Sequence, residues 1–238
     1  MFFTGLVAGF INVMAGGGST LTLPVLIFLG LDGALANGTN RLAILIQNLV
    51  AVYGFRKNKL SAFKTSAYYA LTTLPGAVLG AFAAVQLDDF WFKKILGVVI
   101  VFVIATLALP KPKEKNSAVT PSKKLFLYLS LFGAGFYGGF IQAGVGFILM
   151  ASLFYFGGLN LIKVNMHKVF VVFIYTIPAF LIFVFSGNVD WLLGFVLAVG
   201  NGLGGWIAAR LSVKKGEKII RTVLMIVLIG MAVKLVLF

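Results

Sequence analysis

The sequence of 238 residues contains no cysteine, a single histidine and only six carboxylates. Without cysteine the chain forms no disulfides, no thiolate metal site and no thiol nucleophile. One histidine and so few acids supply neither a metal-ligand set nor a convincing acid–base pair. We therefore expect no metal, no cofactor and no enzymatic activity.

Charge of either sign is also scarce, at 11% of residues, whereas 61% are hydrophobic and the mean hydropathy is +1.06. A soluble domain of this length cannot bury so much apolar surface. Apolar stretches at 95–109, 169–185 and 222–238 are typical of membrane spans. The composition predicts a multi-pass protein of the cell (plasma or inner) membrane, with the lipid bilayer as its first partner.

Lysine and arginine give the chain a formal net charge of +14. In a soluble protein this excess would suggest nucleic acid as a partner. Here the basic residues sit in short loops beside apolar stretches and form no recognition motif, so membrane topology explains them better and no nucleic acid is expected.

The chain divides at a polar linker, residues 111–124, into a first repeat, 1–110, and a second repeat, 125–238. Three stretches match in the same order across the linker: 10–12 with 140–142, 36–40 with 164–168, and 79–84 with 204–209. Each match is weak, but the shared order predicts an internal repeat.

Each repeat begins with a glycine-interrupted apolar segment, 2–31 or 125–159. Three expected spans follow in each: 36–55, 65–87 and 91–109, then 164–185, 191–210 and 218–237. An arm of about 13 residues makes about 20 Å of helix, too short for an apolar core of about 30 Å. Each interrupted segment is therefore either one long broken helix or a re-entrant hairpin.

The basic residues decide between these alternatives. With hairpins, the clusters at 56–64, 111–124 and 210–221 all fall on one side with Lys163, leaving Arg41, Lys93, Lys94 and Lys234 toward the other. With single crossings this bias largely vanishes, so the positive-inside rule favours hairpins. We expect an all-α polytopic membrane protein of two inverted repeats, each a re-entrant glycine-tipped hairpin plus three transmembrane helices. The linker is then cytoplasmic and both termini lie outside.

The hairpin tips are the first candidate site, because irregular backbone at membrane depth is tolerated only against protein or a water-filled cavity. A helix that starts at such a tip presents free N–H donors, which suit an anion. Glycines in membrane helices usually serve close packing, but three in a row before Ser19 interrupt a helix more than they pack it. The candidate ligands are Asn12, Gly16, Gly17, Gly18, Ser19, Thr20, Gln142, Gly144 and Gly146.

A second polar group opens the following span of each repeat: Asn37, Thr39, Asn40 and Arg41, matched by Asn165, His167 and Lys168. Arg41 and Lys168 either anchor at the membrane interface or attract an anion from the two faces. His167 alone is more often a packing residue than a metal ligand or proton carrier. Asn201, between two glycines inside a span, is a weaker candidate.

All six carboxylates fall in loops or at expected span ends: Asp32, Asp88, Asp89, Glu114, Asp190 and Glu217. A carrier coupled to protons or sodium usually keeps an acid at membrane depth. The pattern favours a small anionic substrate and leaves the coupling ion and the direction of transport open.

These motifs resemble the sulfite exporter TauE/SafE family of membrane permeases. The resemblance rests on Gly16-Gly17-Gly18-Ser19 followed by Pro24, on Ala36-Asn37-Gly38-Thr39-Asn40, and on the two-half layout. It implies transport of small sulfur-containing anions such as sulfite, sulfonates or sulfoacetate. The second half departs from the pattern, with Phe154 where a proline would align and Met166-His167 in place of Gly-Thr.

We therefore expect a carrier of such an anion that works by alternating access between inverted halves. The same residues could build an anion channel or a carrier of another small anion. The sequence leaves the oligomeric state open, a homodimer included.

Overall fold

The computed structural model describes residues 1–58, 62–108 and 121–237, which contain helices and no strand. The predicted all-α class is confirmed. The predicted linker lies outside the described residues except for 121–124, which belong to a helix.

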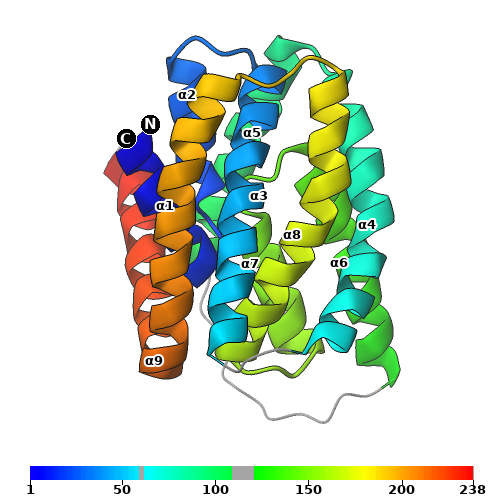
Figure 1. Ribbon diagram of the computed structural model, residues 1–238, viewed down its shortest axis with the longest axis vertical. Coiled ribbons are helices and arrows are strands. Elements are labelled where there is room, and N and C mark those ends of the chain that lie inside the picture. Colours follow the sequence, from blue (N-terminus) through cyan, green and yellow to red (C-terminus); the bar gives the residue numbers. More distant parts are fainter. Residues whose placement is uncertain (59–61, 109–120, 238) are drawn as a thin grey trace.

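The helices follow the predicted order closely. They are α1 (Phe2–Met14), α2 (Ser19–Phe28), α3 (Gly33–Lys57), α4 (Phe63–Val85), α5 (Asp89–Ala108), α6 (Pro121–Phe140), α7 (Val145–Ala151), the π-helical turn η1 (Ser152–Phe156), α8 (Leu161–Phe185) and α9 (Trp191–Leu237). Gly216, at φ 68° and ψ −161°, divides α9 into two helices that run in opposite directions (Figure 1).

The loops gather at two ends of the molecule, which we name from Figure 1. The upper end holds residues 29–32, 86–88 and 186–190, and the lower end holds residue 58, residues 157–160 and the bend at Gly216. α1 descends from near the upper end and α2 returns to it; α6 rises from the lower end and α7 returns there (Figure 1). The two interrupted segments thus fold back from opposite ends.

Glycines let each interrupted helix lie directly on a helix of the other half. A Cβ on Gly200 or Gly204 of α9 would come within 2.2 or 2.1 Å of the Phe2 or Leu6 carbonyl oxygen of α1. A stripe of small residues permits such close parallel packing.

The same contacts recur between α4 and α6. There a Cβ on Gly76 or Gly80 would come within 2.4 or 2.0 Å of the Phe132 or Phe136 carbonyl oxygen. Two pairs of helices distant in sequence therefore share one packing pattern, as a repeat would produce.

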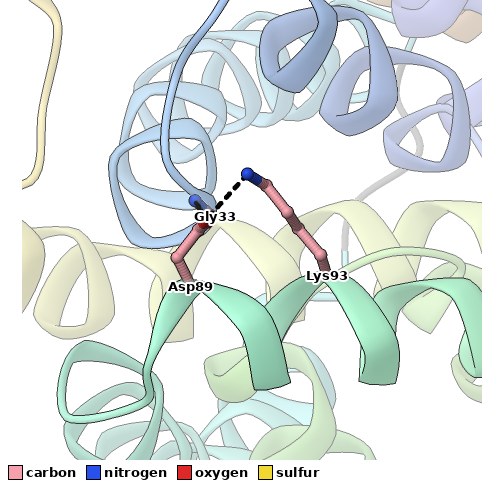
Figure 2. Close-up of polar contacts among 3 residues, drawn as sticks. All are labelled: Gly33, Asp89 and Lys93. Atoms are coloured by element: carbon pink, nitrogen blue, oxygen red, sulfur yellow. Dashed lines mark hydrogen bonds and ion pairs between the residues drawn. The ribbon is translucent and has the colours of Figure 1, made fainter.

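A polar contact joins two helix starts at the upper end. The Asp89 carboxylate accepts a hydrogen bond from the Gly33 backbone N–H at 2.7 Å and pairs with Lys93 one turn later (Figure 2). This contact ties the start of α5 to the start of α3.

Three stretches of the described residues are long and apolar enough to cross a membrane: Phe63–Val85, Leu161–Phe185 and Trp191–Ile220. The 25-residue α3 is as long as α8 but far less apolar, because it carries Asn37, Asn40, Arg41, Gln47 and Asn48. All five side chains are buried. The polarity of α3 is thus directed into the protein.

The close helix contacts predict a measurable difference between two glycines. Gly204→Ala should lower the free energy of unfolding by about 1–3 kcal/mol, because the added Cβ meets backbone rather than a movable side chain. Thermal unfolding in detergent measures the loss. Gly133→Ala is the control, because a Cβ there has nothing within 4 Å; equal midpoints for the two variants would contradict the packing argument.

Candidate functional site

Two helices, α1 and α6, end inside the protein. The last four carbonyls of a helix have no intrahelical partner, and leaving such a group buried without a hydrogen bond costs free energy. The groups that bond these buried carbonyls therefore lie in the interior of the protein.

At the end of α1 all four carbonyls are bonded. Ile11 O accepts from the Ala15 and Gly16 N–H groups. The Lys168 ammonium donates to Asn12 O at 3.1 Å and Val13 O at 2.8 Å. The Asn165 amide donates to Met14 O at 3.3 Å, and its oxygen accepts from Lys168 at 2.9 Å. One amide and one cation from α8 thus cap α1.

The end of α6 has the same arrangement. Tyr137 O accepts from the Ile141 and Gln142 N–H groups. The Arg41 guanidinium donates to Gly138 O at 3.2 Å and also to Gly139 O. The Asn37 amide donates to Phe140 O at 2.7 Å. Here the amide and the cation come from α3.

Both cations are buried, Arg41 at 0% and Lys168 at 2% exposed. The guanidinium lies over the Phe183 ring, 4.6 Å from its centroid. Neither residue is an interfacial anchor, and neither stands at an open entrance. Their positive charges face the negative ends of two helix dipoles.

No carboxylate within residues 1–58, 62–108 and 121–237 pairs with these cations. The acids of the described residues lie at helix ends or in the loops before them: Asp32, Asp88, Asp89, Asp190 and Glu217. No acid of the described residues therefore neutralises Arg41 or Lys168, which are balanced only by helix dipoles and amide oxygens.

The N-terminal sides of the tips are left open. Within the described chain, the backbone N–H groups at the start of α2 and α7 lack a hydrogen-bond partner at Gly17, Gly18, Ser19, Ala143, Gly144 and Gly146. The carbonyl ends of α1 and α6 are capped by side-chain cations, whereas the N–H groups at the start of α2 and α7 are free. Free buried N–H groups suit an anion.

The two tips touch through their backbones. A Cβ on Gly16 would lie 2.4 Å from the Gly146 carbonyl carbon, and one on Gly146 would lie 2.3 Å from the Gly16 Cα. Gly16 and Gly144 have φ of +95° and +73°, and Gln142 has φ of +68°. Positive φ is uncommon for a residue with a side chain. The second tip nevertheless adopts it at Gln142, two residues before Gly144.

A small cavity lies beside this contact. Its lining combines Asn12, Ser19, Asn48, Gln142 and Lys168 with Ile44, Val145, Gly146 and Val172. In this conformation the cavity has room for little more than a water molecule. The Gln142 side-chain oxygen has no partner. A larger ligand needs the tips to move apart.

The remaining candidates lie outside this cavity. His167 bonds to Ser66 of α4 at 2.8 Å, Thr39 accepts from the Asp190 N–H at 2.9 Å, and Asn40 accepts from Thr22 at 2.6 Å. Asn201 is buried where α9 packs on α1, and Thr20 bonds to Gly17 O at 2.6 Å.

Asn48 lines the cavity but is not among the candidate ligands expected from the sequence. Asn37, Arg41 and Asn48 lie four and seven residues apart, with Ile44 between the last two, and so share one face of α3. The helical spacing of these three polar residues is the signal that identifies the face. Thr176, which accepts from Gln142 at 3.4 Å, had no comparable signal.

Comparison with known proteins places the whole chain among membrane transporters. The family model described as sulfite exporter TauE/SafE matches residues 1–235. A probable membrane transporter protein, ORF9, of a Sinorhizobium species is 31% identical, over 99% of this chain and 90% of its own. One from Haemophilus influenzae is 30% identical over 99% and 93%, and YfcA of Escherichia coli is 30% identical over 99% and 88%. No solved structure matches.

The capping contacts predict a loss of stability when Arg41 is replaced by Met. The carbonyls of Gly138 and Gly139 would lose their donor, and each unsatisfied buried group costs about 1–3 kcal/mol. The thermal midpoint in detergent should fall well below that of Arg56→Met, an exposed arginine on the same helix. Similar midpoints for the two variants would refute the capping role.

Proposed function

The chain belongs to the sulfite exporter TauE/SafE family, a family of membrane transporters, and we propose that it carries a small sulfur-containing anion by alternating access. Sulfite, a sulfonate or sulfoacetate is the expected substrate type. The protein is an integral membrane protein, and we place it in the plasma or inner membrane.

One observation supports this proposal above the others. In both interrupted segments, side chains from another helix bond the carbonyls that end the first helix, whereas the N–H groups that start the second helix are free. A cation in the cavity would meet the Lys168 ammonium, whereas an anion would meet that ammonium and free donors. The partial positive charge of a helix start adds to this preference. The interior is therefore suited to negative charge.

We assign binding to the tip backbone from Gly16 to Thr20 and from Gly144 to Gly146. The side-chain amides of Asn12 and Gln142 line the same cavity and can donate to the same anion. Lys168 lines it too and supplies positive charge at close range, whereas Arg41 acts from behind α6. Asn37, Thr39, Asn165 and His167 would line the approach from the two ends.

We propose that the folded-back segments are re-entrant hairpins of two inverted repeats. The opposite directions of α1 and α6, and their matching glycine contacts, support this architecture. The charges of the described residues support its orientation. Basic residues near the lower end include Arg56, Lys57, Lys163, Lys214 and Lys215, whereas the upper loops carry acids. The lower end is then cytoplasmic.

The membrane potential also favours the outward movement of an anion. With an inside-negative membrane potential, one negative charge gains about 2.3 kcal/mol per 100 mV on leaving the cell. Efflux of an anion therefore needs no coupling ion, and no acid of the described residues lies in the cavity to bind one.

Transport itself tests the site at Gly17. A Cβ there would already lie 2.5 Å from the Phe147 ring, so Gly17→Leu should fill the space beside the free N–H groups. We expect uptake of labelled sulfite, sulfonate or sulfoacetate into proteoliposomes to fall about tenfold or more. Gly97→Leu, at a helix position with nothing within 4 Å, is the control.

The outcome also separates a carrier from a channel. Saturable flux with exchange of labelled substrate supports the carrier, whereas an ohmic single-channel current would replace it by an anion channel. Normal transport by Gly17→Leu would disprove the tip assignment.

Topology is tested by single cysteines, which are unambiguous because the chain has none of its own. In intact cells, a membrane-impermeant thiol reagent should label Ser186→Cys at the upper end and leave Lys214→Cys at the lower end unlabelled. Both positions are exposed. Labelling of Lys214→Cys without permeabilisation would reverse or abolish the proposed orientation.

A further inference from the structure

The helices form two packed groups that do not follow the sequence halves. α1 and α3 lie against the first part of α9 and α2 lies against α1 and α3, whereas α6 lies against α4, and α7 and α4 lie against α8. We call these the α3 group (α1, α2, α3 and residues 191–215) and the α8 group (α4, α6, α7 and α8). α3 and α8 themselves pack together at the boundary.

The two cations cross this boundary in opposite directions. Arg41 belongs to the α3 group and caps α6 of the α8 group. Lys168 belongs to the α8 group and caps α1 of the α3 group. The tip contact of Gly16 with Gly146 lies between them. Each cation therefore bonds its own group to the interrupted helix of the other.

The two contacts sit at different depths. Arg41 lies eight residues after the start of α3, about 12 Å from the upper end, and Lys168 lies seven residues after the start of α8, about 10 Å from the lower end. The cavity lies with the tips. Separating the groups at Arg41 would expose the cavity from above, and separating them at Lys168 would expose it from below.

We infer that Arg41 and Lys168 are the gate residues of the transporter, which release in turn to open the cavity to one side. Arg41 with the Gly138 and Gly139 carbonyls forms the upper gate. Lys168 with the Asn12 and Val13 carbonyls forms the lower gate. This inference rests on the proposed alternating access, and it gives the shared geometry of the two caps a second role.

The bonding of Lys168 favours a gate over a dedicated ligand. An ammonium has three donors and no acceptor, and all three have partners, in Asn12 O, Val13 O and Asn165 Oδ1. An anion that took one of these donors would weaken the cap on α1. Binding of substrate and release of the lower gate are thereby linked.

The test is the accessibility of one thiol in the cavity from each side. Ser19→Cys places a thiol in the lining, and a small impermeant reagent is added to one face of oriented vesicles. Adding Arg41→Met should speed labelling from the upper face about tenfold and leave the lower face unchanged. Adding Lys168→Met should do the reverse. A hydrogen bond from a charged donor can shift a two-state equilibrium by about this factor.

Matched variants separate gating from general loosening. Lys163→Met, an exposed lysine on the same helix as Lys168, should change neither rate. Arg41→Lys and Lys168→Arg should each restore part of the slow labelling, because charge and donors remain. If a Met variant fails to fold, Asn37→Ala or Asn165→Ala weakens the same cap and should give the same face preference.

Equal acceleration on both faces, or acceleration on the wrong face, would overturn the inference. Labelling needs no substrate, so failure of the gates can be told apart from failure of the substrate assignment. If labelling follows the face rule but no sulfur-containing anion crosses proteoliposomes, the gates survive and the substrate assignment fails.

Discussion

The fold depends on how two helices can end in the interior of a membrane protein. Lipid offers no hydrogen-bond donors there, so the last carbonyls of each helix need partners from the protein. The chain meets this requirement twice in the same way: the backbone turns back onto one carbonyl, and a distant helix supplies one asparagine and one cation for the others. Because α3 caps α6 and α8 caps α1, neither broken helix is complete without the opposite half of the sequence.

This solution fixes the electrostatics of the interior. A helix end carries roughly half a negative charge, so a full cation more than compensates it. The helix starts at α2 and α7 add partial positive charge close by. The acids of the described chain are confined to the helix ends and loops, so none of them balances this positive charge at the centre. The proposed preference for an anion is in this sense a consequence of capping broken helices with lysine and arginine.

Much of the architecture could be predicted from hydropathy and charge, because these record where each segment meets lipid. The expected spans 36–55 and 164–185 correspond to Gly33–Lys57 and Leu161–Phe185, with errors only at the ends, where loops begin. The partners of Arg41 and Lys168 could not be predicted. Each donates to backbone carbonyls about a hundred residues or more away. Because every residue has a backbone carbonyl, the sequence does not indicate which ones accept these bonds. In the sequence, a lysine or arginine that caps a buried helix end cannot be told from one that anchors at the membrane interface.

The same reasoning explains why the second half can depart from the first without losing its geometry. The triple glycine of the first tip has no counterpart at residues 142–146, yet the chain turns there through Gln142 and Gly144, both at positive φ. The cation moves by one position relative to its asparagine, from Asn37 and Arg41 to Asn165 and Lys168, and still reaches two carbonyls. What the two halves share is a set of bonded carbonyls, which depends on donors within reach rather than on particular residues. The unequal side chains leave the two caps equivalent in role but unequal in strength, since a guanidinium and an ammonium bind carbonyls differently.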